Sequence, residues 1–310
     1  DVIACSFDRW YERFKQLTIP SVILPLSQDF VSYLNADGIQ LPGSSADADD
    51  EDSDSAANES EDGASAPSFP ALMQDMELAV QDLGGAVLPK LNWSAPKDAT
   101  WMTGTLCCKA VDDIVMLLKG SDFVAHDLNH CFDDCTTAKD ELCTVPYVLV
   151  LRRWVDIEEA SEFRCFVSEK KLLAVSQRLT QVCFPHLCEA DVRTDLLAHL
   201  QTWFEHNISN SFPSMRYVFD VSICLTPRKK VLLIDFGPWS QATDPLLFDW
   251  EELQDLAAGQ TEASPEIRVI MSEAEQRAGR LENYHMVPLE VATMGVNTPD
   301  EMADLMRRAE

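Results

Sequence analysis

Two apolar segments separated by a short basic turn constrain the fold of this chain more than any other part of the sequence. They span residues 217–225 and 231–238, and the second ends in a Gly-Pro pair. Apolar runs of this length with a proline-containing turn between them predict a β-hairpin. If the turn centres between residues 227 and 228, Asp220 lies directly opposite Asp235, because both are equally far from that point.

The opposed carboxylates have two interpretations. Directly opposite side chains in a hairpin lie about 5 Å apart at Cβ, where two like charges destabilise the strands unless something neutralises them. A hard divalent cation does so, and Mg²⁺ is usually held by one or two carboxylates together with substrate phosphates. The alternative is a pair of hydrated acids at the rim of the hairpin, which a one-residue slip would place on different faces.

A short apolar strand that ends in a polar, proline-containing loop is the second candidate element of a site. In residues 84–98, Asn92 and the main chain around Ala95 supply hydrogen-bonding groups, and Lys90 and Lys97 supply positive charge. Lysine commonly binds phosphate in nucleotide sites, where it acts as a point charge. The alternative interpretation is a surface loop with ordinary exposed lysines.

Charged side chains interrupt two further segments that otherwise have the composition of buried strands. Arg152 lies in the run 147–154, and Glu162 and Arg164 lie in the run 161–167. Charged groups on buried strands need partners. These residues therefore indicate either internal ion pairs or a polyanionic ligand.

Helices and hairpins alternate along the chain. Apolar residues recur at helical spacing after Ser6 and again between residues 192 and 204, and the segment 163–177 has the pattern of a hairpin. Because hairpins rather than repeated βαβ units connect the strands, we expect an α+β architecture with antiparallel sheets. The sequence contains neither a P-loop nor a Rossmann glycine motif.

Five segments resemble, in order and spacing, the cell division cycle protein 123 family. The similarity covers most of the chain outside its acidic segment, and the five are 89–98, 162–167, 175–178, 233–236 and 243–252. The resemblance implies an α+β, ATP-grasp-like fold with two lobes whose antiparallel sheets clasp a nucleotide. It also implies an assembly chaperone that binds ATP and Mg²⁺. Its partner would be the gamma subunit of eukaryotic translation initiation factor 2, and its role would be to promote heterotrimer formation and hence translation initiation.

The resemblance assigns roles to five residues of the proline-containing loop. Lys90 would reach the α- and β-phosphates of the nucleotide, and Lys97 would lie near the phosphates. Asn92, Trp93 and the main chain of Ala95 would line the nucleotide. All five are therefore expected to bind the cofactor.

The resemblance assigns five further residues on the later strands. Arg152 and Trp154 match the segment that passes the adenine, and Arg164 would meet the phosphate tail. Asp220 and Asp235 would hold Mg²⁺. No residue of the ten is assigned a catalytic role.

Two positions depart from the family pattern. Gly237 stands where the pattern has an asparagine, so one expected oxygen ligand of the metal is missing, and water or a backbone carbonyl would have to replace it. Leu179 stands where an acid usually follows Arg178, which removes a second expected polar contact.

The sequence suggests five regions. Residues 1–42 and 69–145 are expected to form the first lobe, and residues 146–256 the second lobe with the metal site. Residues 43–68 interrupt the first lobe with nine acids between positions 47 and 62 and no Lys or Arg, and a segment so poor in apolar residues is predicted to be disordered. Residues 257–310 form a C-terminal extension.

Composition narrows the functional classes. A net charge of −28 and a pI near 4.4 argue against nucleic-acid binding and favour a partner with a basic face. No apolar run approaches 18 residues, so we expect no membrane span, and no signal peptide is evident. The ten cysteines have no paired spacing, which favours reduced thiols. We expect a cytoplasmic monomer.

Two functional classes remain open. One is an ATP-binding chaperone that needs no turnover of the nucleotide. The other is an ATP-grasp ligase, which activates a carboxylate as an acyl phosphate. Both need the same nucleotide site and differ in an acceptor pocket that the sequence does not locate.

Two local patterns carry weaker expectations. His126, His130, Cys131 and Cys135 have ligand types that suit zinc, but their spacing is irregular, and a surface loop is the favoured interpretation. Residues 298–309 are predicted to form a short amphipathic helix that begins with a capping box.

Overall fold

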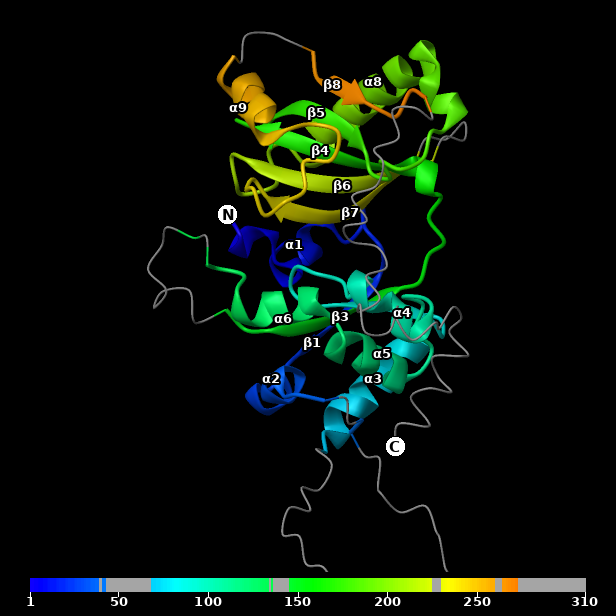
Figure 1. The fold of residues 1–310 in the computed structure, drawn as a ribbon, viewed down its shortest axis with the longest axis vertical. Helices are drawn as coiled ribbons and strands as arrows, with labels where there is room; N and C mark the ends of the chain where they lie inside the picture. The colour runs from blue at the N-terminus through cyan, green and yellow to red at the C-terminus, as the bar shows by residue number, and fades with distance from the viewer. Residues whose placement is uncertain are drawn as a thin grey trace, which may run out of the picture.

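The computed structural model contains two β-sheets at different levels of an elongated molecule (Figure 1). The larger sheet has the strand order β7-β6-β4-β5-β8, and the smaller has the order β1-β3-β2. Among the described residues every strand pairing is antiparallel except that of β5 with β8. The structure describes residues 1–38, 41–42, 68–133, 135, 145–224, 230–259 and 264–272.

The smaller sheet and the helices packed on it form the first lobe. Its strands are β1 (Ser21–Pro25), β2 (Val87–Lys90) and β3 (Val148–Arg153). Its helices are α2 (Gln28–Asn35), α3 (Pro70–Asp82), α4 (Thr100–Thr103), α5 (Val111–Lys119) and α6 (Asp122–Asn129), with the 3-10 helix η2 (Lys97–Ala99). β3 is apolar on both faces because both are covered. Leu149 and Leu151 pack in the core of this lobe, and Val148 and Val150 pack in the core of the other.

The larger sheet forms the second lobe. Its strands are β4 (Glu162–Ser168), β5 (Lys171–Gln177), β6 (Tyr217–Ile223), β7 (Val231–Pro238) and β8 (Glu266–Arg268). The helix α8 (Ala190–Asn207) packs Leu196, Leu200 and Phe204 into one core, and α9 (Trp250–Ala258) contributes Leu253 to a smaller one. The remaining 3-10 helices are η1 (Ile3–Cys5), η3 (Glu159–Ser161) and η4 (Pro185–Cys188).

The helix α1 (Phe7–Phe14) lies between the two sheets (Figure 1). It follows Ser6, as the sequence predicts, and its residues Phe7, Trp10 and Phe14 belong to the core of the larger sheet. The strand β1 and the helix α2 belong to the smaller sheet. The segment 1–42 therefore contributes to both lobes, and the region boundaries given above stay predictions.

Several expectations concern other parts of the chain. The acidic segment up to residue 67 and the predicted C-terminal helix lie outside the described residues. None of the helices that the structure describes is long and apolar enough to cross a bilayer. The cysteines of the described ranges are free thiols, and Cys5, Cys108 and Cys165 are buried.

Candidate functional site

The hairpin β6–β7 places Asp220 opposite Asp235, as predicted, but the register near the turn differs from the predicted one. Near the turn, Val221 pairs with Leu233, whereas a turn centred between residues 227 and 228 would pair Val221 with Ile234. The register there differs from the predicted one by one residue. The register then shifts past Ile234, which restores the opposed pair. Such β-bulges are common beside functional sites because they re-aim side chains.

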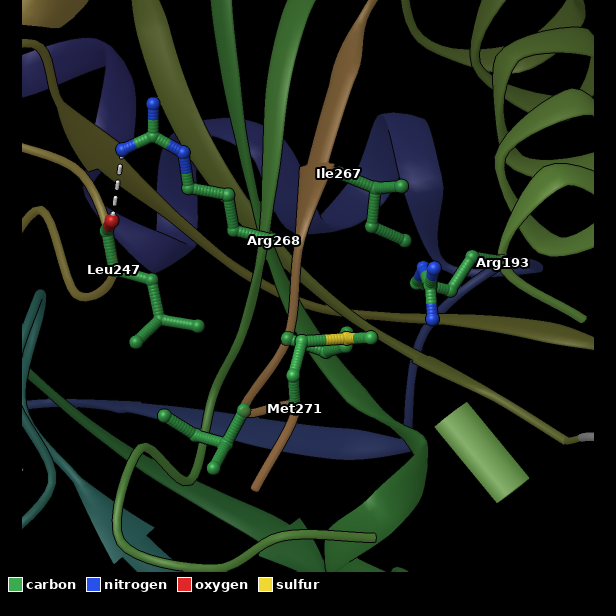
Figure 2. A pocket seen from close by; sticks show the side chains of 7 residues that line it. Arg193, Leu247, Ile267, Arg268 and Met271 are labelled. Carbon is green, nitrogen blue, oxygen red and sulfur yellow. Dashed lines mark hydrogen bonds between the residues drawn. The ribbon is translucent and has the colours of Figure 1, made fainter. Parts of the chain in front are cut away.

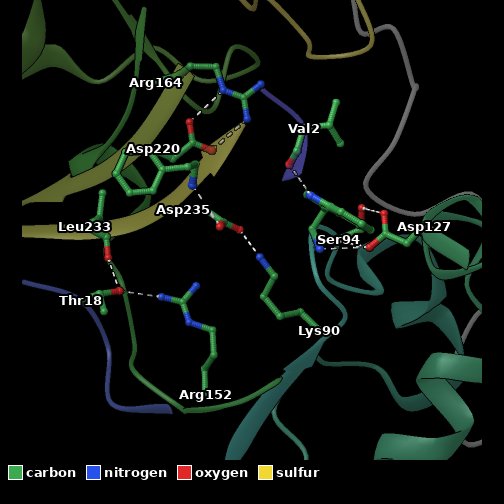
Figure 3. A network of polar contacts seen from close by, with 12 residues as sticks. Val2, Thr18, Lys90, Ser94, Asp127, Arg152, Arg164, Asp220, Leu233 and Asp235 are labelled. Carbon is green, nitrogen blue, oxygen red and sulfur yellow. Dashed lines mark hydrogen bonds and ion pairs between the residues drawn. The ribbon is translucent and has the colours of Figure 1, made fainter. Parts of the chain in front are cut away.

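Asp220 lies in a row of charged side chains that crosses the larger sheet. Arg164 of β4 pairs in register with Asp220 of β6, which pairs with Asp235 of β7. Arg164 donates to both carboxylate oxygens of Asp220, through Nε and Nη2 at 2.8 Å each (Figure 3). The Nε of Arg178 lies 3.7 Å from Oδ2 of Asp220. Burial alone would raise the pKa of Asp220, but Arg164, helped by Arg178, lowers it to about 2.

This pKa predicts how stability changes in acid. The pKa of Asp220 falls from its ordinary 3.8 to about 2 on folding, so its ionised form adds about 2 kcal/mol to the free energy of unfolding above about pH 4. That contribution is lost as the pH falls through 2. Urea denaturation between pH 5 and pH 2 checks this: the stability difference between wild type and Asp220→Asn should shrink by about 2 kcal/mol. A constant difference would contradict it.

Lys90 connects the two lobes. It ends β2 and pairs in register with Val150, so it projects from the face of the smaller sheet that meets the larger one. Its Nζ forms an ion pair with Asp235 (Figure 3) and lies 5.3 Å from the ring centroid of Phe7. Lys90 is only 1% exposed, and burial lowers its pKa against the opposing effect of Asp235. A cation buried this deeply requires anionic partners.

Arg152 is a second buried cation beside Lys90. Its Nη2 donates to Oγ1 of Thr18 at 3.2 Å, and Thr18 Oγ1 donates to the carbonyl oxygen of Leu233 at 2.7 Å (Figure 3). Burial lowers the pKa of Arg152, and Asp235 opposes this effect. Its buried Nε finds no hydrogen-bond partner among the described residues. Orphaned buried donors are rare in native structures and suggest an absent ligand or water.

The side chain of Asn92 ties the loop after β2 to its surroundings. Asn92 is fully buried. Its Nδ2 donates to Ser6 Oγ at 3.0 Å and to Pro146 O at 3.1 Å, and its Oδ1 accepts from Val148 N at 3.0 Å. These contacts use both ends of the amide, so the side chain holds the loop against α1 and β3.

Two other predicted residues, Trp93 and Ala95, lie in this loop, whereas Trp154 lies at the opposite end of β2. The indole Nε1 of Trp93 donates to the carbonyl oxygen of Val2 at 2.9 Å. The carbonyl oxygen of Ala95 accepts from Lys97 N at 2.8 Å, which shapes the turn into η2. Trp154 follows β3 directly and is 36% exposed. It is thus placed at the surface end of the strand that carries Arg152.

Lys97 extends the charged row toward the loop. Burial raises the pKa of Glu162, and the charges of Lys97 and Arg178 oppose this rise. Lys97 also helps to lower the pKa of Asp220, so its charge acts on both carboxylates. We call the following set the charged network: Lys90, Lys97, Arg152, Arg164, Arg178, Glu162, Asp220 and Asp235.

Sequence reasoning missed two contributors to this region. Arg178 lies in one of the family-like segments, and that position was the available signal. Thr18 gives no local signal, because its contact with Arg152 joins residues 134 positions apart.

The pattern of His126, His130, Cys131 and Cys135 is only partly a loop. His126 lies in α6, so the loop interpretation is wrong for that part. His130 Nδ1 lies 2.8 Å from Asp133 Oδ2, and no group of three metal-ligating side chains forms in the part of the chain that the structure describes. The zinc interpretation therefore gains no support.

The opposed carboxylates offer the donor chemistry that Mg²⁺ prefers. Asp220 and Asp235 supply hard oxygen ligands on neighbouring strands, and Mg²⁺ is often bound by two carboxylates completed by phosphate and water. In the structure Arg164 and Lys90 neutralise these two carboxylates. Because both cations can equally bind phosphate, a magnesium–phosphate ligand fits the donor set.

The glycine at position 237 has room for the asparagine of the family pattern. A Cβ atom added to Gly237 would lie 3.7 Å from Thr243 Oγ1 and 4.0 Å from Val218 Cβ, which are ordinary contacts. Gly237→Asn is therefore expected to fold normally and to lower the Mg²⁺ concentration needed for ATP binding several-fold. Calorimetric titration at graded Mg²⁺ measures this, with Gly237→Ala as the matched control. Equal Mg²⁺ dependence in both variants would contradict an added oxygen ligand.

A cavity of about 470 Å³ lies apart from the charged network, beside β8 (Figure 2). Its lining residues include Arg193 of α8, Leu247, and Ile267, Arg268 and Met271 in and after β8. In Figure 2 the guanidinium of Arg268 is directed toward Leu247, whose carbonyl oxygen accepts its hydrogen bond at 3.1 Å. None of the ten predicted site residues lines this cavity.

Two lobes of helices and mainly antiparallel strands, which meet at the charged network, define an α+β protein, as the sequence predicts. The D123 family model matches residues 10–295. The chain belongs to the D123 family.

Named relatives agree with this assignment. The chain is 43% identical over 269 residues to the translation initiation factor eIF2 assembly protein of Emericella nidulans, covering 81% of this chain and 64% of that protein. It is 38% identical over 326 aligned positions to the protein of the same name from Aspergillus niger, covering 98% and 86%. The chain thus spans slightly less than two thirds of the Emericella relative.

A solved structure shows the same fold. The structure of Cdc123 from Schizosaccharomyces pombe superposes with a TM-score of 0.68 at 36% sequence identity. The match covers 86% of this chain and 95% of that one.

Proposed function

We propose that this chain binds ATP with Mg²⁺ between its lobes and acts as an assembly chaperone for eukaryotic translation initiation factor 2. The observation that carries the proposal is the charged network, in which five cationic side chains surround three carboxylates at the junction of the lobes. Lys90 and Arg152, both buried, have the same carboxylate, Asp235, as the main negative charge that acts on them. Two buried cations that share one carboxylate favour an additional anionic ligand.

The proposed roles follow from position and charge. Lys90, Lys97 and Arg164 bind the phosphates, and Asp220 and Asp235 hold Mg²⁺. When bound, the metal supplies positive charge that offsets the phosphate tail. Asp220 and Asp235 would hold the metal, and Lys90 and Arg164, which pair with them in the structure, would be available to the phosphates.

The remaining predicted residues would frame the nucleotide. Asn92, Trp93 and the main chain of Ala95 shape the loop between the two lysines. Arg152 lies in β3, which pairs with β2, and Trp154 follows β3 directly. The orphaned Nε of Arg152 gives this side chain a donor to offer.

The partner is proposed to be the gamma subunit of initiation factor 2, with the chain acting as a cytoplasmic monomer that promotes heterotrimer formation. Two observations support a role in assembly: the names of the relatives and a strongly negative net charge suited to a partner with a basic face.

Two measurements test the proposal. Isothermal titration with Mg·ATP is expected to give saturable binding, and a pull-down with purified gamma subunit is expected to give a complex whose yield depends on ATP. Absence of both would overturn the function. Steady ADP release that depends on an added carboxylate substrate would instead identify a ligase.

A further inference from the structure

The loop between Lys90 and Lys97 and the helix α6 are joined by two carboxylates that point in opposite directions. Asp98, at the end of the loop, accepts hydrogen bonds from α6. Asp127, on α6, accepts hydrogen bonds from the loop. Neither residue belongs to the charged network, and neither is among the residues that the sequence assigned to a ligand.

Asp98 satisfies the first turn of α6. Its Oδ1 accepts from Ser121 Oγ at 2.6 Å, and its Oδ2 accepts from Asp122 N at 2.6 Å and from Phe123 N at 3.3 Å. The first amides of a helix have no partner within the helix, and the positive end of the helix dipole favours a carboxylate there. The end of the loop is therefore anchored to the start of α6 through Asp98 of η2.

Asp127 makes the reverse connection one turn further along α6. Its Oδ2 accepts from Ser94 N at 2.7 Å and from Trp93 N at 3.3 Å, and its Oδ1 accepts from Ser94 Oγ at 2.8 Å (Figure 3). Asp127 is only 2% exposed, and burial raises its pKa although these hydrogen bonds oppose the rise. A carboxylate buried to this degree is tolerated because the loop supplies its hydrogen-bond donors.

The reciprocal arrangement fixes the loop more firmly than either contact alone. The two anchors hold the loop at Trp93–Ser94 and at Asp98, on either side of the segment that carries Lys97. A rigid shift of this whole segment relative to α6 breaks hydrogen bonds at both anchors. Lys97 is therefore held against α6 from both sides, a few residues after Lys90 at the end of β2.

We propose that Asp98 and Asp127 are positioning residues that form a reciprocal carboxylate clamp between the loop and α6. The clamp holds Lys90 and Lys97 in the arrangement that receives the phosphates of the nucleotide. The inference rests on the proposed function for the identity of the ligand, and on the geometry alone for the clamp.

Alanine variants test the clamp, because alanine removes both carboxylate oxygens that accept hydrogen bonds from the loop or from α6. Amide hydrogen exchange is measured on ligand-free Asp98→Ala and Asp127→Ala, with the exposed Asp82→Ala as the matched control. Exchange at Trp93 and Ser94 should rise at least tenfold in both variants, including Asp98→Ala, although Asp98 does not touch these amides. Exchange at Leu149 and Leu151 in the core should not change.

Two further readouts decide the positioning role. Mg·ATP affinity should fall at least tenfold in each variant, and the buried Lys90 should react faster with an amine-selective ester than in wild type. A rise in exchange confined to the mutated anchor would overturn the reciprocal clamp, and so would unchanged affinity and unchanged Lys90 labelling. Wild-type protein that fails to bind Mg·ATP would overturn the proposed function, while exchange and Lys90 labelling would still decide the clamp.

Discussion

Replacing Lys90 with methionine is expected to weaken Mg·ATP binding roughly 30- to 100-fold while changing the free energy of unfolding by no more than about 1 kcal/mol. A hydrogen bond to a charged group contributes about 1.5–3 kcal/mol, and each 1.4 kcal/mol is tenfold in affinity. Methionine has a similar length and is apolar, so it suits a site that is 1% exposed and lies against the ring of Phe7. The carboxylate of Asp235 keeps access to water, with 24% of its side chain exposed.

Isothermal titration and urea denaturation on one preparation measure both quantities. Lys171→Met is the matched control, because Lys171 is exposed on β5 and lies outside the charged network. Wild-type affinity in Lys90→Met would remove Lys90 from the nucleotide site. A loss of several kcal/mol in stability would show instead that the ammonium mainly supports the fold.

Local patterns predicted the elements of this fold but not all of their pairings. The apolar spacing after Ser6 predicts α1, yet it does not say that Phe7, Trp10 and Phe14 pack on the larger sheet rather than on the sheet of the neighbouring β1. An apolar stripe on a helix shows that this face packs against a core, but it does not show which sheet supplies that core.

The hairpin shows the same limit at the level of register. The opposed pair of Asp220 and Asp235 was predicted from symmetry about the turn, and it is confirmed. The β-bulge at Ile234 was not predicted, because an apolar residue in a strand has the same pattern whether or not it is bulged. The strand ends beside the turn are one residue out of the predicted register, and the bulge at Ile234 shifts the register back by one residue.

The contacts that build the candidate site are the least visible in the sequence. Lys90 and Asp235 are 145 residues apart, and Asp127 lies 33 residues from Ser94. One signal was available for Asp127: it shares a helix face with Val124 and Leu128, both buried. A carboxylate on the apolar face of a helix needs an internal partner.

Asp235→Ala is expected to destabilise the protein by about 2–3 kcal/mol in addition to weakening Mg·ATP binding. The sequence alone favours a loss of binding with little change in stability, because the carboxylate was expected to face a metal. The structure changes this expectation, since Asp235 is the ion-pair partner of buried Lys90 and also opposes the lowered pKa of Arg152. Removing one partner of a buried ion pair leaves an uncompensated charge, which typically costs about 3–5 kcal/mol, and the partial exposure of Asp235 reduces that figure.

A double-mutant cycle separates the charge effect from the loss of packing. Combining Asp235→Ala with Lys90→Met removes both members of the pair, so the double variant is expected to recover about 2 kcal/mol of the stability lost in Asp235→Ala. Urea denaturation of the four proteins at pH 7 gives the coupling, and calorimetric titration should find the double variant unable to bind Mg·ATP tightly. Additive losses of stability would show that Lys90 and Asp235 do not compensate each other. The buried Lys90 and Arg152 would then not depend on Asp235, and the case that this junction needs an anionic ligand would lose its electrostatic basis.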